Sequence, residues 1–435
     1  MAHFDLVIIG GGPAGLTAGL YAARANMNAI LFEAKGLGGE ILNTDLIEDW
    51  PGEESITGRA LSDKMAAHAQ KFGLKVEIKA VDKIRTDGDK KIIRMTDGTE
   101  HSAYAVIVTV GGEPIKLGVP GEQEFHGRGV SYCAVCDGAF FKGVDLAVIG
   151  GGDSAFQEGL FLTRFAKKLY VVHRRGEFKA QAILQDRLLA MDKVETITPA
   201  VVKEIGGNGD VKWMDVERGG RVERIPVEGV FIFIGFKPLG RELFEDHIEH
   251  DGNGYLVTDQ FMRTNIPGVY AAGDARSQLA KQITTAVGDA TTAVLHAERY
   301  IEGLKHAEKA FPRAEPRVVA EEAERVRTLR FMPGQVVIRE GDDADRFFIV
   351  LHGQFAVTRR TGAGETELKT IGPGEHFGEI GLLKGIKRVA TVRAKTDGEL
   401  LVMGRKSFRR IVESSSTARA VIEAEADARL REVGV

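Results

Sequence analysis

The sequence predicts an α/β protein with two nucleotide-binding domains and, at its C-terminal end, a β-barrel with flanking helices. Two glycine-rich loops, each preceded by an apolar strand and followed by a helix, predict the nucleotide-binding domains. Short alternating strands separated by Gly and Asp in residues 331–360 predict the barrel. The length of 435 residues agrees with about three domains, because a domain usually spans roughly 150 residues.

The first glycine loop lies in residues 4–34, "FDLVIIGGGPAGLTAGLYAARANMNAILFEA". Gly10, Gly12 and Gly15 form a G-x-G-x-x-G motif, which lets a pyrophosphate approach a helix N-terminus. Glu33 ends the second strand, where a carboxylate accepts hydrogen bonds from a ribose diol. An ordinary glycine turn would not explain why strand, helix and carboxylate are in register. We therefore expect a Rossmann-like domain that binds FAD.

The same pattern returns in residues 146–175, "LAVIGGGDSAFQEGLFLTRFAKKLYVVHRR", with the motif G-x-G-x-x-A. Where the first copy carries a carboxylate, this copy carries His173, Arg174 and Arg175. A basic cluster suits a ribose that bears a 2′-phosphate. The alternative is a solvated strand end, but the matching offset favours a second Rossmann-like domain that binds NADPH.

Cys133 and Cys136 are the only cysteines in the chain, and they lie in "SYCAVCDGAFF". A structural zinc site needs four ligands, and no second cysteine pair exists, so we expect no metal. A disulfide that closes so short a loop constrains the unfolded chain little. A Cys-x-x-Cys beside βαβ elements in a reducing compartment instead favours a redox-active dithiol.

Charge and hydropathy exclude two classes of partner. The net charge of −4, without a basic stripe, disfavours nucleic acid. Apolar runs such as "GVFIFIGF" are shorter than the roughly 20 residues of a membrane-spanning helix. No charged leader precedes the first apolar strand. We therefore expect a cytoplasmic protein without nucleic-acid or membrane partners.

A third segment, residues 264–301, places Asp274 after an apolar strand and before a long Ala/Thr-rich helix. Asp274 could be a simple helix cap. With FAD already expected, however, this segment is where the first domain should return to the flavin.

Four motifs, "EDWPG", "CAVCDG", "HRRGEFKAQ" and "GVYAAGD", together resemble bacterial low-molecular-weight thioredoxin reductase over residues 1 to about 303. The resemblance implies a homodimeric flavoprotein in which NADPH reduces FAD, FAD reduces the cysteine pair, and the dithiol reduces thioredoxin. It also implies that Cys136 faces the flavin, that Cys133 attacks the disulfide of thioredoxin, and that Asp137 supplies the proton.

The resemblance further assigns contacts residue by residue. For FAD they are Gly10, Gly12, Pro13, Ala14, Gly15, Glu33, Glu40, Asn43, Gly273, Asp274, Lys281, Gln282 and Ile283. For NADPH they are Gly150, Gly152, Asp153, Ser154, Ala155, His173, Arg174, Arg175 and Lys179. Arg128, Phe140 and Phe141 fall where the family docks thioredoxin, or are a surface charge and core aromatics.

Four positions depart from the family pattern. Glu40 stands where glutamine is usual, and Val110 replaces a threonine at a strand end. Lys179 and Lys281 replace arginines, which keeps the charge but loses the bidentate fork. These changes bear on affinities and on flavin properties rather than on the class of reaction.

The expected division is 1–112 (FAD-binding, first segment), 113–243 (NADPH-binding, with the cysteine pair), 244–303 (FAD-binding, second segment), 304–320 (linker) and 321–435 (barrel domain). Nicotinamide and the cysteine pair cannot occupy one flavin face together. We therefore expect the two nucleotide-binding domains to rotate about hinges near Gly111–Gly112 and Gly235–Gly240.

Residues 373–394, "PGEHFGEIGLLKGIKRVATVRA", resemble the phosphate-binding cassette of cyclic-nucleotide-binding domains. The resemblance implies that Gly378 permits close approach, that Glu379 binds the ribose 2′-hydroxyl, and that Arg388 with a helix N-terminus holds the cyclic phosphate. Val389 is bulkier than the residue usual there. We expect cAMP or cGMP as effector, and amphipathic helix over residues 408–433.

Three functional hypotheses follow. The first is an NADPH-dependent thioredoxin reductase modulated by a cyclic nucleotide. The second is a signalling or docking flavoprotein with a ligand-free C-terminal domain. The third is an oxygen-dependent dithiol oxidase, which would not need the basic cluster at His173.

Overall fold

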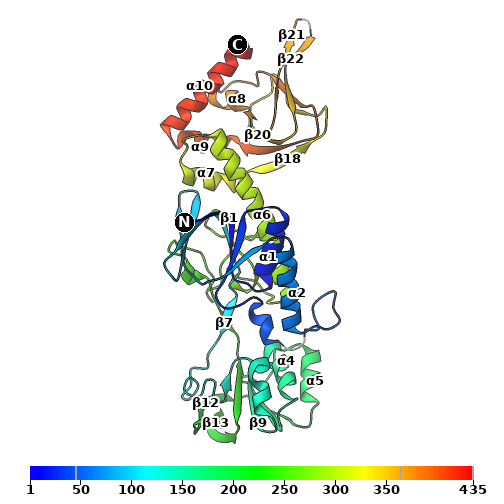
Figure 1. Cartoon of the computed structure of the whole chain (residues 1–435), viewed down its shortest axis with the longest axis vertical. Coiled ribbons are helices and arrows are strands. Elements are labelled where there is room, and N and C mark those ends of the chain that lie inside the picture. The colour runs from blue at the N-terminus through cyan, green and yellow to red at the C-terminus, as the bar shows by residue number, and fades with distance from the viewer. Residues whose placement is uncertain (45–46, 363, 434–435) are drawn as a thin grey trace.

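The computed structural model describes residues 1–44, 47–362 and 364–433, which form three parts stacked along one long axis (Figure 1). The first α/β unit, which holds β1, lies in the middle. The second α/β unit, which holds β9, lies at one end, and the C-terminal barrel lies at the other. The predicted α/β class with a terminal β-barrel is confirmed. No helix in the described ranges is both long and apolar enough to cross a membrane.

The sheet of the first unit has the order β3-β2-β1-β6-β5-β4, and β17 also pairs with β6. β1, β2, β3, β6 and β17 pair in parallel, whereas β4 and β5 are antiparallel additions at one edge. The strands are β1 (His3–Ile9), β2 (Ala29–Glu33), β3 (Lys75–Ile78), β4 (Val81–Asp87), β5 (Lys90–Met95), β6 (Glu100–Val108) and β17 (Val269–Ala271).

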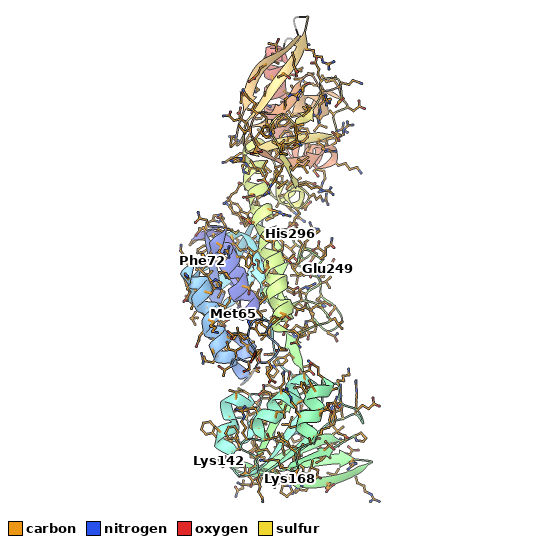
Figure 2. The ribbon with its side chains drawn as sticks, turned by 90° about the vertical axis from the view of Figure 1, so that its right-hand side faces the viewer. Met65, Phe72, Lys142, Lys168, Glu249 and His296 are labelled. Atoms are coloured by element: carbon orange, nitrogen blue, oxygen red, sulfur yellow. The ribbon has the colours of Figure 1, made fainter. Side chains whose placement is uncertain are left out.

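The helices of this unit are α1 (Pro13–Arg24), α2 (Gly58–Lys71) and α6 (Ile283–Ala310), with short 3₁₀ turns η1 (Gly39–Asn43) and η4 (Gly273–Ala275). Pro13 is the first residue of α1, where its missing N–H costs nothing. The predicted domain end at residue 303 falls inside α6, which continues without a break to Ala310. Figure 2 shows α6, marked by His296, running from the middle of the molecule toward the C-terminal barrel.

The second unit has a parallel sheet with the order β11-β10-β9-β15-β8 and a three-stranded antiparallel meander, β12-β13-β14. Its strands are β8 (Val130–Ser131), β9 (Asp145–Gly150), β10 (Lys168–Val172), β11 (Val194–Ile197), β12 (Val201–Asn208), β13 (Asp210–Arg218), β14 (Arg221–Pro226) and β15 (Gly229–Phe233). Its helices are α3 (Ala134–Asp137), η2 (Gly138–Phe141), α4 (Asp153–Leu162) and α5 (Ala182–Leu189).

Two chain crossings join the units, and they pair as the antiparallel strands β7 (Gly112–Pro114) and β16 (Phe236–Pro238) (Figure 1). Gly111 and Gly240 flank this ribbon with φ values of +63° and +118°, which residues with a side chain rarely adopt. The 3₁₀ turn η3 (Arg241–Leu243) then leads back to the first unit. The predicted hinges thus lie at the ends of a two-stranded connection, and the rotation itself stays a prediction.

The C-terminal barrel consists of two four-stranded antiparallel sheets, β18-β25-β20-β23 and β19-β24-β21-β22. Its strands are β18 (Arg327–Phe331), β19 (Val336–Ile338), β20 (Arg346–His352), β21 (Phe355–Thr361), β22 (Gly364–Ile371), β23 (His376–Phe377), β24 (Thr391–Ala394) and β25 (Gly398–Gly404). Its helices are α8 (Glu379–Lys384), α9 (Arg405–Glu413) and α10 (Ser416–Val433).

The stretch 408–433 is helical as predicted, but it is divided into α9 and α10 with a break between them. Ser414 ends α9, and its hydroxyl donates to the Ile411 carbonyl at 2.6 Å. Ser415 then accepts a hydrogen bond from the Ala418 N–H at 3.4 Å, as an N-cap serine does. The two serines therefore end one helix and start the next.

The barrel packs on the first unit through α6 and the short helix α7 (Pro316–Ala323). Phe311, which ends α6, is buried between Phe347 of the barrel and Phe408 of α9, with ring centroids 5.1 and 5.7 Å away. These rings belong to a hydrophobic core that continues into the first unit. The helices α6 and α7 and one continuous hydrophobic core therefore connect the first unit to the barrel.

Candidate redox centre and nucleotide sites

The first glycine loop is tightly packed at two of its glycines. A Cβ at Gly15 would lie 1.8 Å from the Gly10 carbonyl oxygen, and one at Gly10 would lie 2.5 Å from the Thr109 carbonyl oxygen. The Thr109 hydroxyl contacts the carbonyls of Ile9 and Gly10, each at 2.9 Å. The next residue, Val110, packs against the core behind the sheet. Strand, helix and loop can approach this closely only because the glycines lack side chains.

Three glycine turns from separate segments meet at the start of α1. A Cβ at Gly39 would lie 3.1 Å from the Gly12 Cα, and a Cβ at Gly273 would lie 3.1 Å from the Ala14 Cβ. At Gly12 itself the nearest atom to an added Cβ would be 3.9 Å away. The residues thus leave a cradle of backbone N–H groups at a helix N-terminus, which fits the pyrophosphate of FAD.

The Glu33 carboxylate lies beside this cradle. It accepts hydrogen bonds from the N–H groups of Gly11 at 2.6 Å, Lys35 at 2.8 Å and Gly36 at 3.3 Å. These bonds hold the carboxylate at the end of β2 against the glycine loop. An acceptor in this position fits the ribose hydroxyls of FAD.

The expected flavin end of the site is formed by η1, η4 and the start of α6. Burial raises the pKa of Asp274, which the Lys281 ammonium partly offsets. Lys281 donates to the Asp274 and Arg276 carbonyls at 3.3 and 2.7 Å. Gln282 caps α6 just before Ile283. The predicted side chains of residues 274–283 therefore lie together here, close enough to η1 for the charge of Asp274 to raise the pKa of Glu40.

Glu40 and Asn43 lie on the opposite wall, in η1. Asn43 Nδ2 donates to Glu40 Oε2 at 3.0 Å. Although Glu40 keeps an exposed surface, crowding of its carboxyl by protein atoms raises its pKa, and the bond from Asn43 partly opposes this rise. The glutamate that departs from the family pattern thus bonds to Asn43, whose amide oxygen faces Cys133.

The redox centre meets η1 at the start of α3. The Cys133 sulfur is disulfide-bonded, and it lies 3.3 Å from Asn43 Oδ1 of the first unit. The Cys133 N–H donates to the Ser131 hydroxyl at 3.0 Å, and the Asp137 N–H donates to the Cys133 carbonyl at 3.3 Å. The side chain of Cys136 lies outside the described part of the structure. Cys133 therefore borders the wall of the expected flavin site.

In the second glycine loop, the segment that starts at His173 folds over the glycines. A Cβ at Gly151 would lie 2.5 Å from the His173 ring. The N–H groups of Lys179 and Ala180 donate to the Gly151 carbonyl at 2.6 and 3.0 Å. Gln181 donates to both oxygens of Asp153. A Cβ at Gly152 would have no atom within 4 Å, so there is open space at this glycine. Gly152 directly precedes α4, whose first turn contains Ser154 and the buried Ala155.

The basic cluster is arranged around one buried ring nitrogen. Burial, then the charges of Arg174 and Arg175, lower the pKa of His173. Its Nε2 is buried without a hydrogen-bond partner among the described residues. Arg174, Arg175 and Lys179 are exposed. Three cations and an unsatisfied imidazole nitrogen beside a phosphate loop fit the 2′-phosphate of NADPH.

The residues expected to dock thioredoxin divide into two kinds. Phe140 is 82% exposed. Phe141 packs edge-on against Phe231 at 5.6 Å, and Arg128 donates to the Glu124 carbonyl at 2.5 Å. An exposed aromatic ring beside the cysteines is available to a partner, whereas Phe141 helps to form the core.

The barrel contains a cavity of about 260 Å³ over the cassette. Gly378 has a φ of +92°, and a Cβ there would lie 2.9 Å from Arg388 Nη1. Arg388 is 4% exposed and donates to the carbonyls of Gly378 at 2.9 Å and Arg346 at 2.7 Å. Burial lowers the pKa of Arg388. The cation that is predicted to bind the cyclic phosphate therefore already has two acceptors in this structure.

The cassette glutamate is also engaged, by a residue that sequence reasoning missed. Glu379 is 1% exposed, and its Oε1 accepts a hydrogen bond at 2.7 Å from Arg429 of α10. The second oxygen, Oε2, is buried without a hydrogen-bond partner within the described ranges. On the same helix, Glu425 lies 3.3 Å from His376 Nε2. The four-residue spacing of Glu425 and Arg429 signals one helix face, but not what that face covers.

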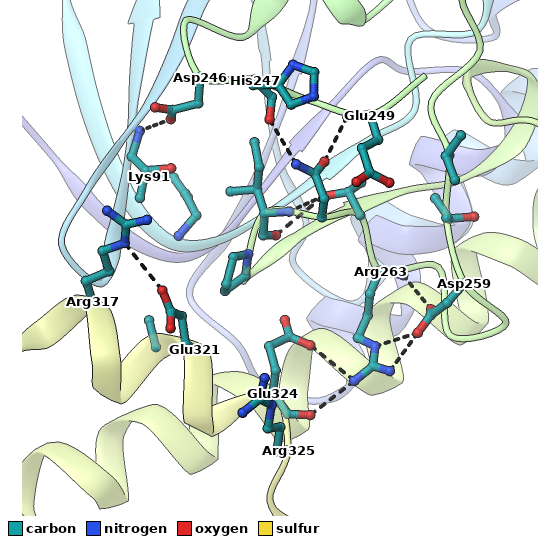
Figure 3. A pocket seen from close by; sticks show the side chains of 18 of the residues that line it. Lys91, Asp246, His247, Glu249, Asp259, Arg263, Arg317, Glu321, Glu324 and Arg325 are labelled. Atoms are coloured by element: carbon teal, nitrogen blue, oxygen red, sulfur yellow. Dashed lines mark hydrogen bonds and ion pairs between the residues drawn. The ribbon is translucent and has the colours of Figure 1, made fainter. Parts of the chain in front are cut away.

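A second cavity, of about 1020 Å³, lies between the first unit and α7 (Figure 3). Glu324, just after α7, accepts hydrogen bonds from the Gly268 N–H at 2.9 Å and from Arg263 at 3.4 Å. Arg263 is held in turn by Asp259 at 2.6 Å. These contacts attach the linker to the loop before β17, on the route from the barrel to the expected flavin site.

Two dinucleotide-type loops around one cysteine pair define a redox enzyme that uses a pyridine nucleotide. Residues 4–290 match the pyridine nucleotide-disulphide oxidoreductase family, and residues 328–415 match the cyclic nucleotide-binding domain. The chain belongs to the pyridine nucleotide-disulphide oxidoreductases, and within them to the thioredoxin reductases. The resemblances predicted from the sequence are confirmed for both parts.

Individual relatives support this assignment. The thioredoxin reductase of Listeria innocua is 46% identical over 312 residues, which cover 71% of this chain and 97% of that protein. The thioredoxin reductase of Bacillus subtilis is 44% identical over 310 residues, covering 70% and 97%. The crystal structure of Lactococcus lactis thioredoxin reductase in its FR conformation superposes with a TM-score of 0.67 at 41% identity, covering 69% of this chain and 99% of that one.

Proposed function

We propose that this chain carries electrons from NADPH through FAD to the Cys133–Cys136 pair and on to thioredoxin, and that a cyclic nucleotide bound in the barrel modulates this transfer. The observation that carries the proposal is the 3.3 Å contact between the Cys133 sulfur and Asn43 of η1. It brings the redox pair of the second unit to the wall of the glycine cradle in the first.

Each nucleotide site has a defined set of tasks. Bound FAD supplies two-electron chemistry between a nicotinamide and a disulfide. The cradle at Gly12 binds its pyrophosphate, and Glu33 binds its ribose. Arg174 and Arg175 bind the 2′-phosphate that distinguishes NADPH from NADH, because guanidinium groups form strong charge-assisted bonds to phosphate.

The proposed electron path needs one proton donor and one movement. Asp137, at the end of the short helix α3 that follows Cys133, gives a proton when the disulfide is reduced. The units then rotate about Gly111 and Gly240, so that Cys133 leaves Asn43 and meets the disulfide of thioredoxin. Phe140 is the exposed surface for that partner. We further propose the domain division given above, a homodimer, and a cytoplasmic location.

The barrel is proposed to act through α6, α7 and the Glu324–Arg263 contact. A cyclic nucleotide would bring its phosphate to Arg388 and its 2′-hydroxyl to Glu379, in competition with the carbonyls and with Arg429. A ligand shifts an equilibrium only by binding two states unequally, and the rotating units supply two such states. A coupling free energy of about 1–3 kcal/mol is typical of allosteric proteins.

The alternative is a barrel that docks a partner without binding a nucleotide. It is favoured by the observation that Arg388 and Glu379 already have protein partners. The test is thioredoxin reduction by NADPH, followed with and without cAMP and cGMP, together with calorimetry on the same chain. We expect binding heat and a change in kcat or KM. Absence of heat with both nucleotides would favour docking, and binding without a kinetic change would contradict modulation.

A further inference from the structure

The Cys133 sulfur, the Asn43 amide and the Glu40 carboxylate form a line across the boundary between the two α/β units. Asn43 Oδ1 lies 3.3 Å from the sulfur, and Asn43 Nδ2 lies 3.0 Å from Glu40 Oε2. These two neighbours of the amide are functional positions. One is a redox cysteine, and the other is the glutamate that departs from the family pattern.

The carboxylate fixes which end of the amide faces the sulfur. An ionised carboxylate can only accept hydrogen bonds, so Glu40 requires the NH₂ group of Asn43. The carbonyl oxygen of Asn43 must then face Cys133. A glutamine at position 40 could offer either a donor or an acceptor, and it would leave both amide orientations open.

Reduction turns this contact into a hydrogen bond. Two electrons from NADPH break the sulfur–sulfur bond, and uptake of two protons leaves two thiols, whereas uptake of one leaves a thiol and a thiolate. A thiol at Cys133 can donate its proton to Asn43 Oδ1, but a thiolate can only meet that oxygen as an unfavourable negative neighbour. A hydrogen bond to the neutral form of an acid disfavours its ionisation.

We propose that Glu40 and Asn43 are positioning residues that keep reduced Cys133 protonated while the redox pair lies against the first unit. Cys133 becomes the attacking thiolate only after this contact opens. The inference rests on the proposed function, in which Cys133 attacks thioredoxin. The contact with Asn43 thus keeps Cys133 from acting as a nucleophile until the pair has moved away from the flavin.

Further carboxylates lie on the elements next to Cys133. Asp137 lies on α3, which begins directly after Cys133, and Asp153 and Glu158 lie on α4, which packs against α3. Across the boundary, Glu40 is influenced by Asp274 and by Lys35, the one cation of this set. Carboxylates near a thiol oppose its ionisation, because the thiolate would add another negative charge beside them.

The test measures the ionisation of Cys133 directly. In the FAD-loaded Cys136→Ser variant Cys133 is the only thiol, and its rate of alkylation by iodoacetamide across neutral to alkaline pH gives its pKa. Adding Asn43→Ala should raise the alkylation rate at neutral pH about three- to tenfold, because one hydrogen bond to the thiol is lost. Asn43→Asp should lower the rate, because it places a carboxylate at the sulfur. Glu40→Gln should raise it by less than Asn43→Ala.

Glu54→Gln is the matched control, since it removes one exposed carboxylate from the loop after η1 and should leave the rate unchanged. The flavin absorbance of each variant reports that the site remains folded, and Glu40→Gln restores the residue usual in the family. An unchanged rate in both Asn43→Ala and Glu40→Gln would overturn the proposal, as would shifts of one sign in Asn43→Ala and Asn43→Asp. If the expected rates appear but the wild type does not reduce thioredoxin, the proposed function fails and the positioning role stands.

Discussion

The two regions of this molecule that we propose to bind phosphate differ in how their cations are engaged. At the second glycine loop, Arg174 and Arg175 are exposed beside the unsatisfied Nε2 of His173. In the barrel, Arg388 is buried and already donates to two carbonyls, while Glu379 is held by Arg429. The first region can bind a phosphate without losing a protein contact, whereas the second must exchange contacts.

The largest expected effect comes from the cysteines. Cys133→Ser and Cys136→Ser should each abolish thioredoxin reduction, because neither variant can form the disulfide that stores two electrons. Reduction of the flavin by NADPH should persist, since it precedes the disulfide step. Flavin bleaching under anaerobic conditions measures the first step, and thioredoxin turnover measures the second. Turnover that survives in either variant would contradict the electron path.

The next effect tests the open phosphate site. Replacing Arg174 and Arg175 by alanine should lower kcat/KM for NADPH by at least about tenfold, because each charge-assisted hydrogen bond contributes about 1.5–3 kcal/mol. The value for NADH should hardly change, since NADH lacks the 2′-phosphate. The ratio of the two kcat/KM values is the measurement. An equal loss with both nucleotides would mean that the cluster does not recognise the phosphate.

The third prediction concerns the contact between Glu379 and Arg429 in the barrel and its effect on the stability of that domain. Arg429→Gln leaves the buried Glu379 carboxylate without its cation, and breaking such a pair should lower the free energy of unfolding of the barrel by about 3–5 kcal/mol. Arg419→Gln is the matched control, because Arg419 lies on the same helix but pairs with Glu423 in solvent. Chemical denaturation of the full chain compares them. Equal stability of the two variants would show that Arg429 does not hold the cassette.

Features encoded by short sequence motifs could be predicted, whereas contacts between residues far apart in the sequence could not. The glycine loops, the cysteine pair and the cassette are short motifs whose chemistry depends on neighbours in the chain, so the fold class and both family resemblances could be predicted. Arg429 could not, because nothing in α10 reveals that it reaches Glu379. The contact of Asn43 with Cys133 likewise depends on how two units are placed. The helix break at Ser414 was missed because serine is tolerated within helices as well as at their ends.

The smallest expected effect is a pH dependence in the barrel. Burial is the main cause that lowers the pKa of His376, although Glu379 and Glu425 oppose it. Folded His376 therefore binds a proton less readily than unfolded His376, whose pKa is about 6.5. Its stabilising contribution is complete above that value and is lost as pH falls through the lowered pKa. In His376→Gln, the unfolding free energies measured above pH 6.5 and below the lowered pKa should become more similar to each other. His352→Gln, which changes an exposed histidine of β20, should leave their difference unchanged.

The most direct test of the central claim is the oxidation of NADPH by the FAD-loaded chain with oxidised thioredoxin as the sole acceptor, under anaerobic conditions. We expect steady turnover that depends on thioredoxin, and a clear preference for NADPH over NADH. Flavin that is reduced by NADPH but passes no electrons to thioredoxin would contradict the account. Equal efficiency with NADH would contradict the role given to Arg174 and Arg175.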